Sequence, residues 1–339
     1  MGKDRKNLVD GYIGTYQSEE SRGIYHFLFD PDTGRMTEPE LFYEAQNAKW
    51  VSLNDRMIIF PMERQGRAGT CFLELGDGGA DYVQVTEVLE ESQTPCYILQ
   101  DGDMVYTANY HEGNVMVYRL QDGVPSLVNR IENGTGAGCH QILLHGTMLM
   151  VPCLTQDRIR LFDTSREFAP AGEILFPRGS GPRHGVFNRE HTKLYVVSEL
   201  SNELFVFHVK GNEFCLMQSL PVLPEGEAKA VASAAIRLAA DERFLYISIR
   251  GINRLAVLDV RSHPAAVVQH VSSGGDHPRD FVLSGDGRFL LAANRLEGGI
   301  VCMERDKTTG LLGEVRQHVA MPEAVSLVLH CGELSGSGL

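Results

Sequence analysis

The sequence predicts an all-β fold, a seven-bladed β-propeller built from four-stranded antiparallel blades. Two observations support this prediction. A strand–turn–strand unit recurs along the whole chain, and the residues that close the second strand of each unit lie 44 to 51 positions apart. A repeat period in the mid-forties, with about four strands per repeat, is typical of a propeller blade. The seven closing residues are Thr15, Met62, Asn109, Cys153, Glu199, Arg250 and Asn294.

The repeats fill the chain, so the sequence predicts a single domain over residues 8–331 and a loose tail over 332–339. Five copies are clear, and the two nearest the amino terminus are looser. In chain order they read GYIGTYQSEESRGIYHFLF (11–29), MIIFPMERQGRAGTCFLEL (57–75), VYTANYHEGNVMVY (105–118), LMVPCLTQDRIRLF (149–162), YVVSELSNELFVFH (195–208), YISIRGINRLAVLD (246–259) and LLAANRLEGGIVCM (290–303).

A short segment precedes most of these units and supplies the first strand of each blade. We call these the opening segments, and they read NAKWVSL, TPCYILQ, AGCHQILL, GPRHGVF, ASAAIRLA and HPRDFVL. One more, PEAVSLVLH (322–330), stands alone near the carboxyl end, while the amino-terminal unit lacks a first strand. Joining the two in one blade closes the ring without a gap. The stretch 225–240 fits an opening segment but also reads as a short helix.

Composition restricts the kind of partner that this protein has. Hydrophobic residues make up 43% and charged residues 22% of the 339 residues, which is typical of a soluble globular protein. The net charge of −13 argues against nucleic acid, whose phosphates need a cationic surface. No apolar run approaches the ~20 residues that span a bilayer, so no membrane partner is expected. Seven cysteines without a C-x-x-C pair predict reduced thiols and a cytoplasmic protein.

The opening segments and the turns between second and third strands lie on one face of a propeller, so their side chains should ring the mouth of its channel. Arg183 and His184 open one strand and Glu199 closes the next. Neighbouring antiparallel strands place such ends side by side, so we expect these three side chains to meet. Arg250 and Arg279 belong to the same face. Guanidinium groups are the preferred ligands of phosphate and carboxylate, so the three arginines should converge on an anion.

Other residues of this face have two interpretations each. His140, with His184 and Glu199, supplies groups for proton transfer near neutral pH. Asn109 and Asn294 are candidates for binding substrate, although asparagine at such turns often bonds its own backbone. The Arg183–Glu199 pair also reads as a brace for the blade. No spacing of His, Cys, Asp or Glu predicts a metal site, and no cofactor is expected.

Several motifs resemble the lactonase family of seven-bladed propellers, which includes cycloisomerase-type 6-phosphogluconolactonases and carboxymuconate lactonizing enzymes. The resemblance covers nearly the whole chain and is most specific in GPRHGVF with VVSELSNELFVF, in IRGINRLAVLDV and in HPRDFVLSGDGRFLLAAN. It implies that a histidine, an arginine and a glutamate act at the channel mouth. By motif these catalytic residues are His140, Arg183 and Glu199, with Arg250 as a further candidate.

Three positions depart from the family pattern. Tyr97 stands where a histidine is common, Cys139 replaces one histidine of a His-Ala-His segment, and Arg295 replaces a usual glutamine. These changes leave the fold prediction intact and bear on the substrate. The candidate substrate-binding residues are His184, Arg250, Arg279, Asn109 and Asn294.

Three classes of function stay open at this stage. The first is hydrolysis of a lactone, with His140 or Glu199 as the base, Arg183 as its electrostatic partner, and Arg250 and Arg279 holding a phosphate. The second is a cycloisomerase that acts on a carboxylated muconate. The third is a binding scaffold without chemistry, since a propeller fold does not determine function. An enzyme of this kind is expected to bind a small anionic lactone as a monomer or weak homo-oligomer.

Overall fold

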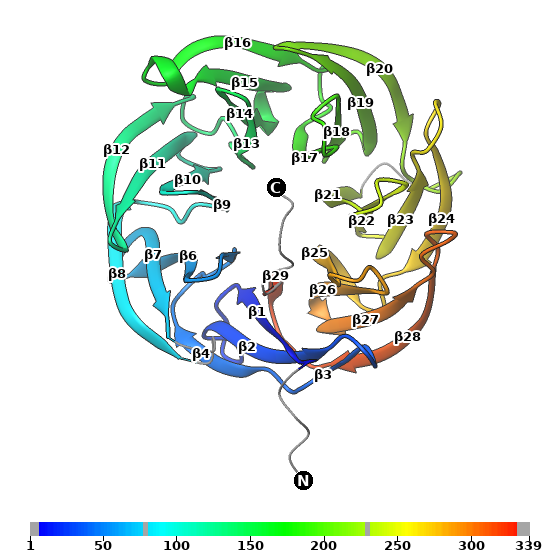
Figure 1. The fold of residues 1–339 in the computed structure, drawn as a ribbon, viewed down its shortest axis with the longest axis horizontal. Helices are drawn as coiled ribbons and strands as arrows, with labels where there is room; N and C mark the ends of the chain where they lie inside the picture. Colours follow the sequence, from blue (N-terminus) through cyan, green and yellow to red (C-terminus); the bar gives the residue numbers. More distant parts are fainter. Residues whose placement is uncertain (1–6, 77–80, 228–230, 331–339) are drawn as a thin grey trace.

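The computed structural model describes residues 7–76, 81–227 and 231–330, which form seven antiparallel sheets in a closed ring (Figure 1). In each blade the strands run outwards from an inner strand near the centre of the ring to an outer strand at its rim. The predicted seven-bladed β-propeller is therefore confirmed. The tail predicted over 332–339 lies outside the described residues.

Blades 2 to 4 follow one another around the first part of the ring. Blade 2 contains β5 (Ser52–Leu53), β6 (Met57–Arg64), β7 (Arg67–Leu75) and β8 (Tyr82–Glu91). Blade 3 contains β9 (Tyr97–Asp101), β10 (Met104–Asn109), β11 (Asn114–Gln121) and β12 (Val124–Glu132). Blade 4 contains β13 (Leu143–His145), β14 (Met148–Cys153), β15 (Arg158–Asp163) and β16 (Ala169–Leu175), with the 3-10 turns η2 (Leu154–Gln156) and η3 (Thr164–Arg166).

Blades 5 to 7 complete the regular part of the ring. Blade 5 contains β17 (Pro182–Phe187), β18 (Lys193–Ser198), β19 (Glu203–Lys210) and β20 (Glu213–Pro221). Blade 6 contains β21 (Ala232–Leu238), β22 (Phe244–Arg250), β23 (Arg254–Asp259) and β24 (Ala266–Ser272). Blade 7 contains β25 (Asp276–Leu283), β26 (Phe289–Glu297), β27 (Ile300–Arg305) and β28 (Leu312–Val319). The second half of the stretch 225–240 thus forms the inner strand β21 rather than a helix, because it pairs with β22.

Blade 1 joins the two ends of the described chain. Its inner strand is β29 (Ala324–Leu329), which pairs with β1 (Val9–Thr15) so that Ile13 lies opposite Leu327. β1 pairs in turn with β2 (Gly23–Asp30), and the outer position is divided between β3 (Arg35–Met36) and β4 (Glu40–Glu44), which both pair with β2. The closure of the ring by a carboxyl-terminal strand is therefore as predicted.

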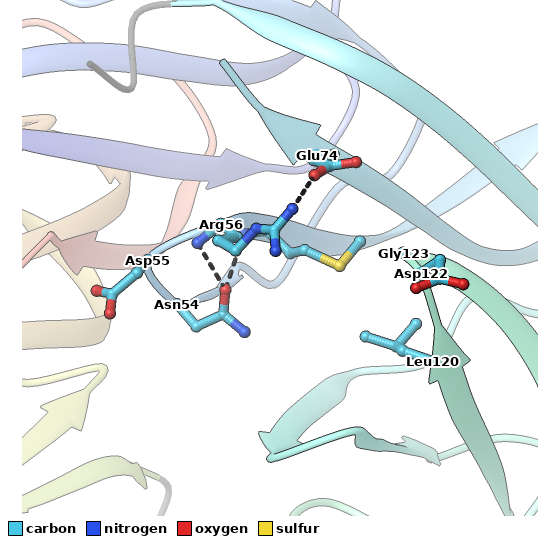
Figure 2. A pocket seen from close by; sticks show the side chains of 8 residues that line it. Asn54, Asp55, Arg56, Glu74, Leu120, Asp122 and Gly123 are labelled. Carbon is cyan, nitrogen blue, oxygen red and sulfur yellow. Dashed lines mark hydrogen bonds and ion pairs between the residues drawn. The ribbon is translucent and has the colours of Figure 1, made fainter. Parts of the chain in front are cut away.

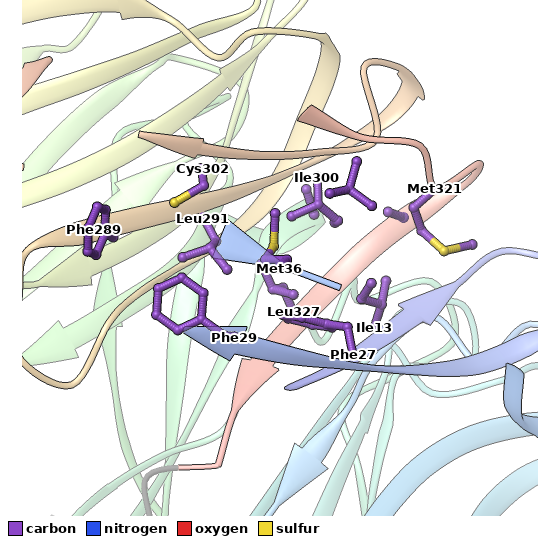
Figure 3. Packing of buried hydrophobic residues seen from close by; sticks show 13 residues of the cluster. Ile13, Phe27, Phe29, Met36, Phe289, Leu291, Ile300, Cys302, Met321 and Leu327 are labelled. Atoms are coloured by element: carbon purple, nitrogen blue, oxygen red, sulfur yellow. The ribbon is translucent and has the colours of Figure 1, made fainter. Parts of the chain in front are cut away.

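The hydrophobic core lies between neighbouring blades, because successive side chains of a strand point to opposite faces of its sheet. Figure 3 shows this packing where blade 7 meets blade 1. The rings of Phe29 and Phe289 meet edge to face, with centroids 6.0 Å apart, and such a pair contributes roughly 0.5–1.5 kcal/mol beyond its buried area. Phe27 packs across Gly11, where a Cβ would lie 2.3 Å from the phenyl ring. The closing blade is thus fixed by apolar packing as well as by its strand ladder.

Helices contribute little to this fold. In the described part of the chain they are the three-residue 3-10 turns η2 and η3, and Asn7 is also in a 3-10 turn. Over the same residues, no helix has the length and apolar character needed to cross a membrane.

Candidate active site

A β-bulge recurs near the start of several inner strands and directs side chains to one place. The ladder of blade 5 skips Arg183, that of blade 7 skips Arg279, and that of blade 1 skips Val325. A bulge re-aims the extra side chain, and these three side chains line the same cavity. Gly181, with φ of +65°, turns the chain into the bulge of blade 5, where a Cβ would come within 2.8 Å of Leu200.

Arg183 is almost completely buried, with 2% of its surface exposed, and two partners hold its guanidinium group. Nε donates to Glu199 Oε2 at 2.8 Å, and Nη1 donates to the carbonyl oxygen of Ala234 at 2.7 Å. Ala234 itself lies in an irregular part of the ladder between β21 and β22. The expected meeting of Arg183 with Glu199 is therefore observed. A buried cation without such a partner is strongly destabilising, so Glu199 is required for Arg183 to stay buried.

Glu199 binds two guanidinium groups through one oxygen atom. Its Oε2 lies 2.8 Å from Arg183 Nε and 3.0 Å from Arg250 Nη2. Arg250 also donates to the carbonyl oxygens of Ala232 and Ser233, at 3.2 Å each. Burial raises the pKa of Glu199, but Arg183 and Arg250 outweigh burial and hold this pKa below its ordinary value. Glu199 is therefore ionised at neutral pH and accepts a proton poorly.

His140 and His184 form a buried hydrogen-bonded pair. His140 Nδ1 lies 3.1 Å from His184 Nε2, so one ring donates and the other accepts. Burial, followed by the positive charge of Arg183, lowers the pKa of both imidazoles well below the ordinary range. Arg183 Nη1 lies 3.3 Å from each nitrogen of His184. Both rings are consequently neutral near pH 7.

Aromatic side chains form a wall around the histidine pair. The rings of Trp50 and Tyr97 contact each other in a tilted arrangement, with centroids 4.4 Å apart, and both meet the His184 ring edge to face. Tyr110 meets the His140 ring edge to face at 5.8 Å. The Trp50 indole N–H donates to the carbonyl oxygen of Ile98 at 3.0 Å, which fixes the wall in place. Trp50 and Tyr97 thus pack on each other and restrict the orientation of His184.

A small cavity lies among these side chains, with room for about one water molecule. Its lining comes from the inner strands, or from the residues immediately before them, of every blade except blade 6. The lining residues are Lys49, Trp50, Cys96, His140, Arg183, His184, Arg279 and Val325.

The two asparagine candidates lie outside this lining. Asn109 is fully buried, and its Nδ2 donates to Glu91 Oε1 at 2.8 Å and to the carbonyl oxygen of Gln93 at 2.7 Å. Asn294 is also fully buried, inside β26, and its Nδ2 donates to the carbonyl oxygen of Ser273 at 3.3 Å. Asn109 therefore ties blade 3 to the end of β8 and the loop after it, and Asn294 ties β26 to the loop between β24 and β25.

Sequence analysis did not single out every lining residue. Lys49, Trp50 and Val325 belong to the opening segments, so their place in the repeat was the available signal. Val325 has no reactive group, and Trp50 reads equally well as a packing residue. Lys49 carries a charge at the position that Arg183 and Arg279 occupy in other opening segments, and this is the signal that identifies it.

Two further observations concern ligands. Over the described residues, no group of three or more His, Cys, Asp or Glu side chains is placed to hold a metal ion. A separate pocket of about 590 Å³ lies beside the β5–β6 and β11–β12 turns (Figure 2). Arg56 Nη2 donates there to Glu74 Oε1 at 2.7 Å. This pocket is at the other end of β5 from Lys49 and Trp50, and none of the candidate residues lines it.

Comparison with known proteins agrees with this architecture. Residues 10–329 match the family described as "Lactonase, 7-bladed beta-propeller", and the chain belongs to that family. The 6-phosphogluconolactonase of Bacillus subtilis strain 168 is 30% identical over 338 residues, which cover 93% of this chain and 96% of that protein.

Solved structures show the same fold. A protein from Lactobacillus plantarum has a TM-score of 0.88 and 26% identity, over 95% of this chain and 99% of that one. The periplasmic gluconolactonase of Pseudomonas aeruginosa has a TM-score of 0.86 and 24% identity, over 96% of this chain and 99% of that one. At this level of identity the second likeness supports the fold alone.

Proposed function

We propose that the protein hydrolyses the lactone of a sugar acid, in the manner of a 6-phosphogluconolactonase, at one mouth of the propeller channel and without a metal ion. The observation that carries this proposal is the neutral His140–His184 pair beside the buried Arg183 guanidinium, around a cavity the size of a water molecule. Membership of the lactonase family and the Bacillus subtilis relative support the same chemistry.

Hydrolysis of a lactone needs a base for the attacking water and a positive charge near the carbonyl oxygen. His140 suits the first role, because it is neutral and lines the cavity. Glu199 suits it less, because two guanidinium groups hold its charge. The water oxygen bonds to the carbonyl carbon, Arg183 stabilises the resulting oxyanion, and the ring C–O bond then breaks. The released ring oxygen takes up the proton that His140 accepted from the attacking water and becomes a hydroxyl group.

The proposal is tested by progress curves for glucono-δ-lactone and its 6-phosphate, measured beside the spontaneous hydrolysis of each. We expect His140→Asn to lower kcat by about 10²–10⁴-fold and Arg183→Met by about 10²–10³-fold. Because Arg183→Met leaves Glu199 paired with Arg250 alone, the double variant Arg183→Met/Glu199→Gln controls for folding. Lys210→Met, an exposed change at the end of β19, should leave the rate unchanged. A wild-type rate equal to the blank for both lactones would overturn the proposal.

The remaining expectations need their own measurements. A muconate substrate in the same assay tests the cycloisomerase alternative, and unchanged turnover after chelation tests metal independence. The assembly as a monomer or weak homo-oligomer stays a prediction. So does a cytoplasmic location, and the Pseudomonas aeruginosa relative is described as periplasmic.

A further inference from the structure

Two cations at the cavity lack a carboxylate partner among the residues that the structure describes. Lys49 and Arg279 both line the cavity, and neither side chain forms an ion pair or hydrogen bond with the described protein groups. The guanidinium carbon of Arg279 lies 5.4 Å from the centre of the Tyr16 ring. A contact with a ring face positions the guanidinium and leaves its N–H groups available to a ligand. Neither cation therefore has a carboxylate within ion-pair distance among the described residues, although Lys49 lowers the pKa of Glu91 and Arg279 lowers that of Glu199 from farther away.

A comparison of blades 5 and 7 explains why Arg279 is unpaired. Arg183 and Arg279 occupy equivalent bulges in their inner strands. Glu199 follows Arg183 by 16 positions, and Arg295 follows Arg279 by the same 16 positions. Arg295 forms its own ion pair, with Glu323, at 2.7 Å. In blade 5 the position 16 residues after the inner arginine holds a glutamate, which pairs with that arginine. In blade 7 the same position holds an arginine, so Arg279 has no corresponding partner.

The charge of Lys49 acts on the same part of the cavity as that of Arg279. Burial raises the pKa of the Cys96 thiol, and Lys49, Arg183 and Arg279 all oppose this rise. All three cations therefore act on Cys96, which lines the cavity with them, although they come from different blades. Arg183 and Arg250 share Glu199, whereas Lys49 and Arg279 have no carboxylate within ion-pair distance among the described residues.

Arg250 differs from these two residues. Its guanidinium binds Glu199 at 3.0 Å and also donates to two backbone carbonyl oxygens of β21. A ligand phosphate would have to displace these bonds or share the Arg250 guanidinium with the Glu199 carboxylate. The sequence alone assigned a phosphate to Arg250 and Arg279, whereas the contacts favour Lys49 as the partner of Arg279.

We propose that Lys49 and Arg279 form the subsite for a phosphate monoester on the substrate, an inference that rests on the lactone hydrolysis proposed above. A phosphate monoester carries a charge of about −1.5 to −2 at pH 7, which matches two unit positive charges. A protein with a net charge of −13 repels such a dianion unless a local cationic site offsets its field. The cavity itself holds only about one water molecule, so the phosphate and the lactone lie at its opening, with the lactone carbonyl toward His140 and Arg183.

The experiment measures equilibrium binding of 6-phosphogluconate and gluconate by calorimetry, so that its result does not depend on turnover. We expect Lys49→Met and Arg279→Met each to weaken 6-phosphogluconate binding by roughly tenfold to a hundredfold, as for loss of a charge-assisted hydrogen bond. Gluconate binding should stay unchanged in both variants. Lys210→Met is the matched control, since it removes an exposed cation from β19 and should alter neither affinity.

Kinetics separate this inference from the proposed function. In the same two variants KM should rise for the phosphorylated lactone and stay constant for glucono-δ-lactone. If the wild-type protein hydrolyses both lactones but the variants bind 6-phosphogluconate normally, the subsite is wrong and the hydrolase stands. If both variants weaken the binding of gluconate and of 6-phosphogluconate equally, the phosphate subsite is also wrong. The same holds if the wild type binds 6-phosphogluconate no better than gluconate. Failure of the wild type to hydrolyse either lactone removes the proposed function instead, and the binding data then decide the anion subsite.

Discussion

Glu91 provides a prediction whose size follows directly from its surroundings. It ends β8, is 5% exposed, and accepts a hydrogen bond from Asn109 Nδ2 through Oε1. Its Oε2 atom is buried without a partner among the described residues. Burial raises the pKa of this carboxyl from 4.5 to about 7, despite the opposing hydrogen bond from Asn109. Glu91 is thus largely protonated in the folded protein at slightly acidic pH.

The stability of the wild type should therefore fall as the pH rises through this range. Below pH 4.5 the carboxyl is protonated in both the folded and the unfolded chain, so the shift has no effect. Between pH 4.5 and about 7 only the unfolded chain loses the proton, which favours unfolding. At about 1.4 kcal/mol per pKa unit, the full loss is about 3 kcal/mol and is complete above pH 7.

Glu91→Gln removes this titration and keeps the shape of the protonated carboxyl group. The quantity to compare is the free energy of unfolding of Glu91→Gln minus that of the wild type. We expect this difference to be about 3 kcal/mol larger at pH 8 than at pH 4.5. Denaturant unfolding at several pH values measures this difference. Glu90→Gln, the exposed neighbour, is the matched control and should show no such trend. A difference between Glu91→Gln and wild type that is constant with pH would refute the reasoning.

Three more predictions follow from the site. Glu199→Gln should destabilise the protein by about 3 kcal/mol in denaturant unfolding at pH 7, because it strands the buried Arg183, whereas exposed Glu213→Gln should have little effect. Since the folded pKa of Glu199 is lowered, this difference should disappear as the pH falls below 4.5; a difference that persists there contradicts the ion-pair argument. The kcat/KM for lactone, corrected for the blank, should be constant from pH 6.5 to 8 and fall only at more acidic pH, because the pKa of His140 is well below 6.5; a midpoint near 6.5 would exclude it as the base. Among the cysteines of the described residues, Cys215 alone is exposed and should react first with a thiol reagent in the native state, as peptide mapping can show; earlier labelling of a buried thiol would contradict the burial.

The sequence predicted the ring and the principal contact of the site for a physical reason. Antiparallel neighbours in a repeat bring residues 15 or 16 positions apart to one edge, so Arg183 and Glu199 could be paired from spacing alone. Apolar opening segments and regular turns likewise specify seven blades and the closing strand. These are local rules that repeat along the chain.

Other features depend on details that spacing does not encode. The bulges that aim Arg183 and Arg279 inward need one extra residue in a ladder, and no residue type marks that position. Spacing also treats Asn109 and Glu199 alike, although Asn109 bonds the backbone of the turn that follows it and of the loop before β9, whereas Glu199 binds two arginines. The absence of a partner for Arg279 could have been inferred from Arg295, by comparing the blades with one another.

The closing strand determines where a fusion partner can be attached. Val325 lies at the cavity near the start of β29, whereas Leu329 ends the strand roughly 14 Å away, opposite Gly11 near the start of β1. Leu329 and the start of β1 therefore both lie away from the cavity end of β29. Tags, linkers or surface tethers attached at either end should leave the cavity accessible to small molecules, so immobilised protein should keep the binding behaviour of the free form.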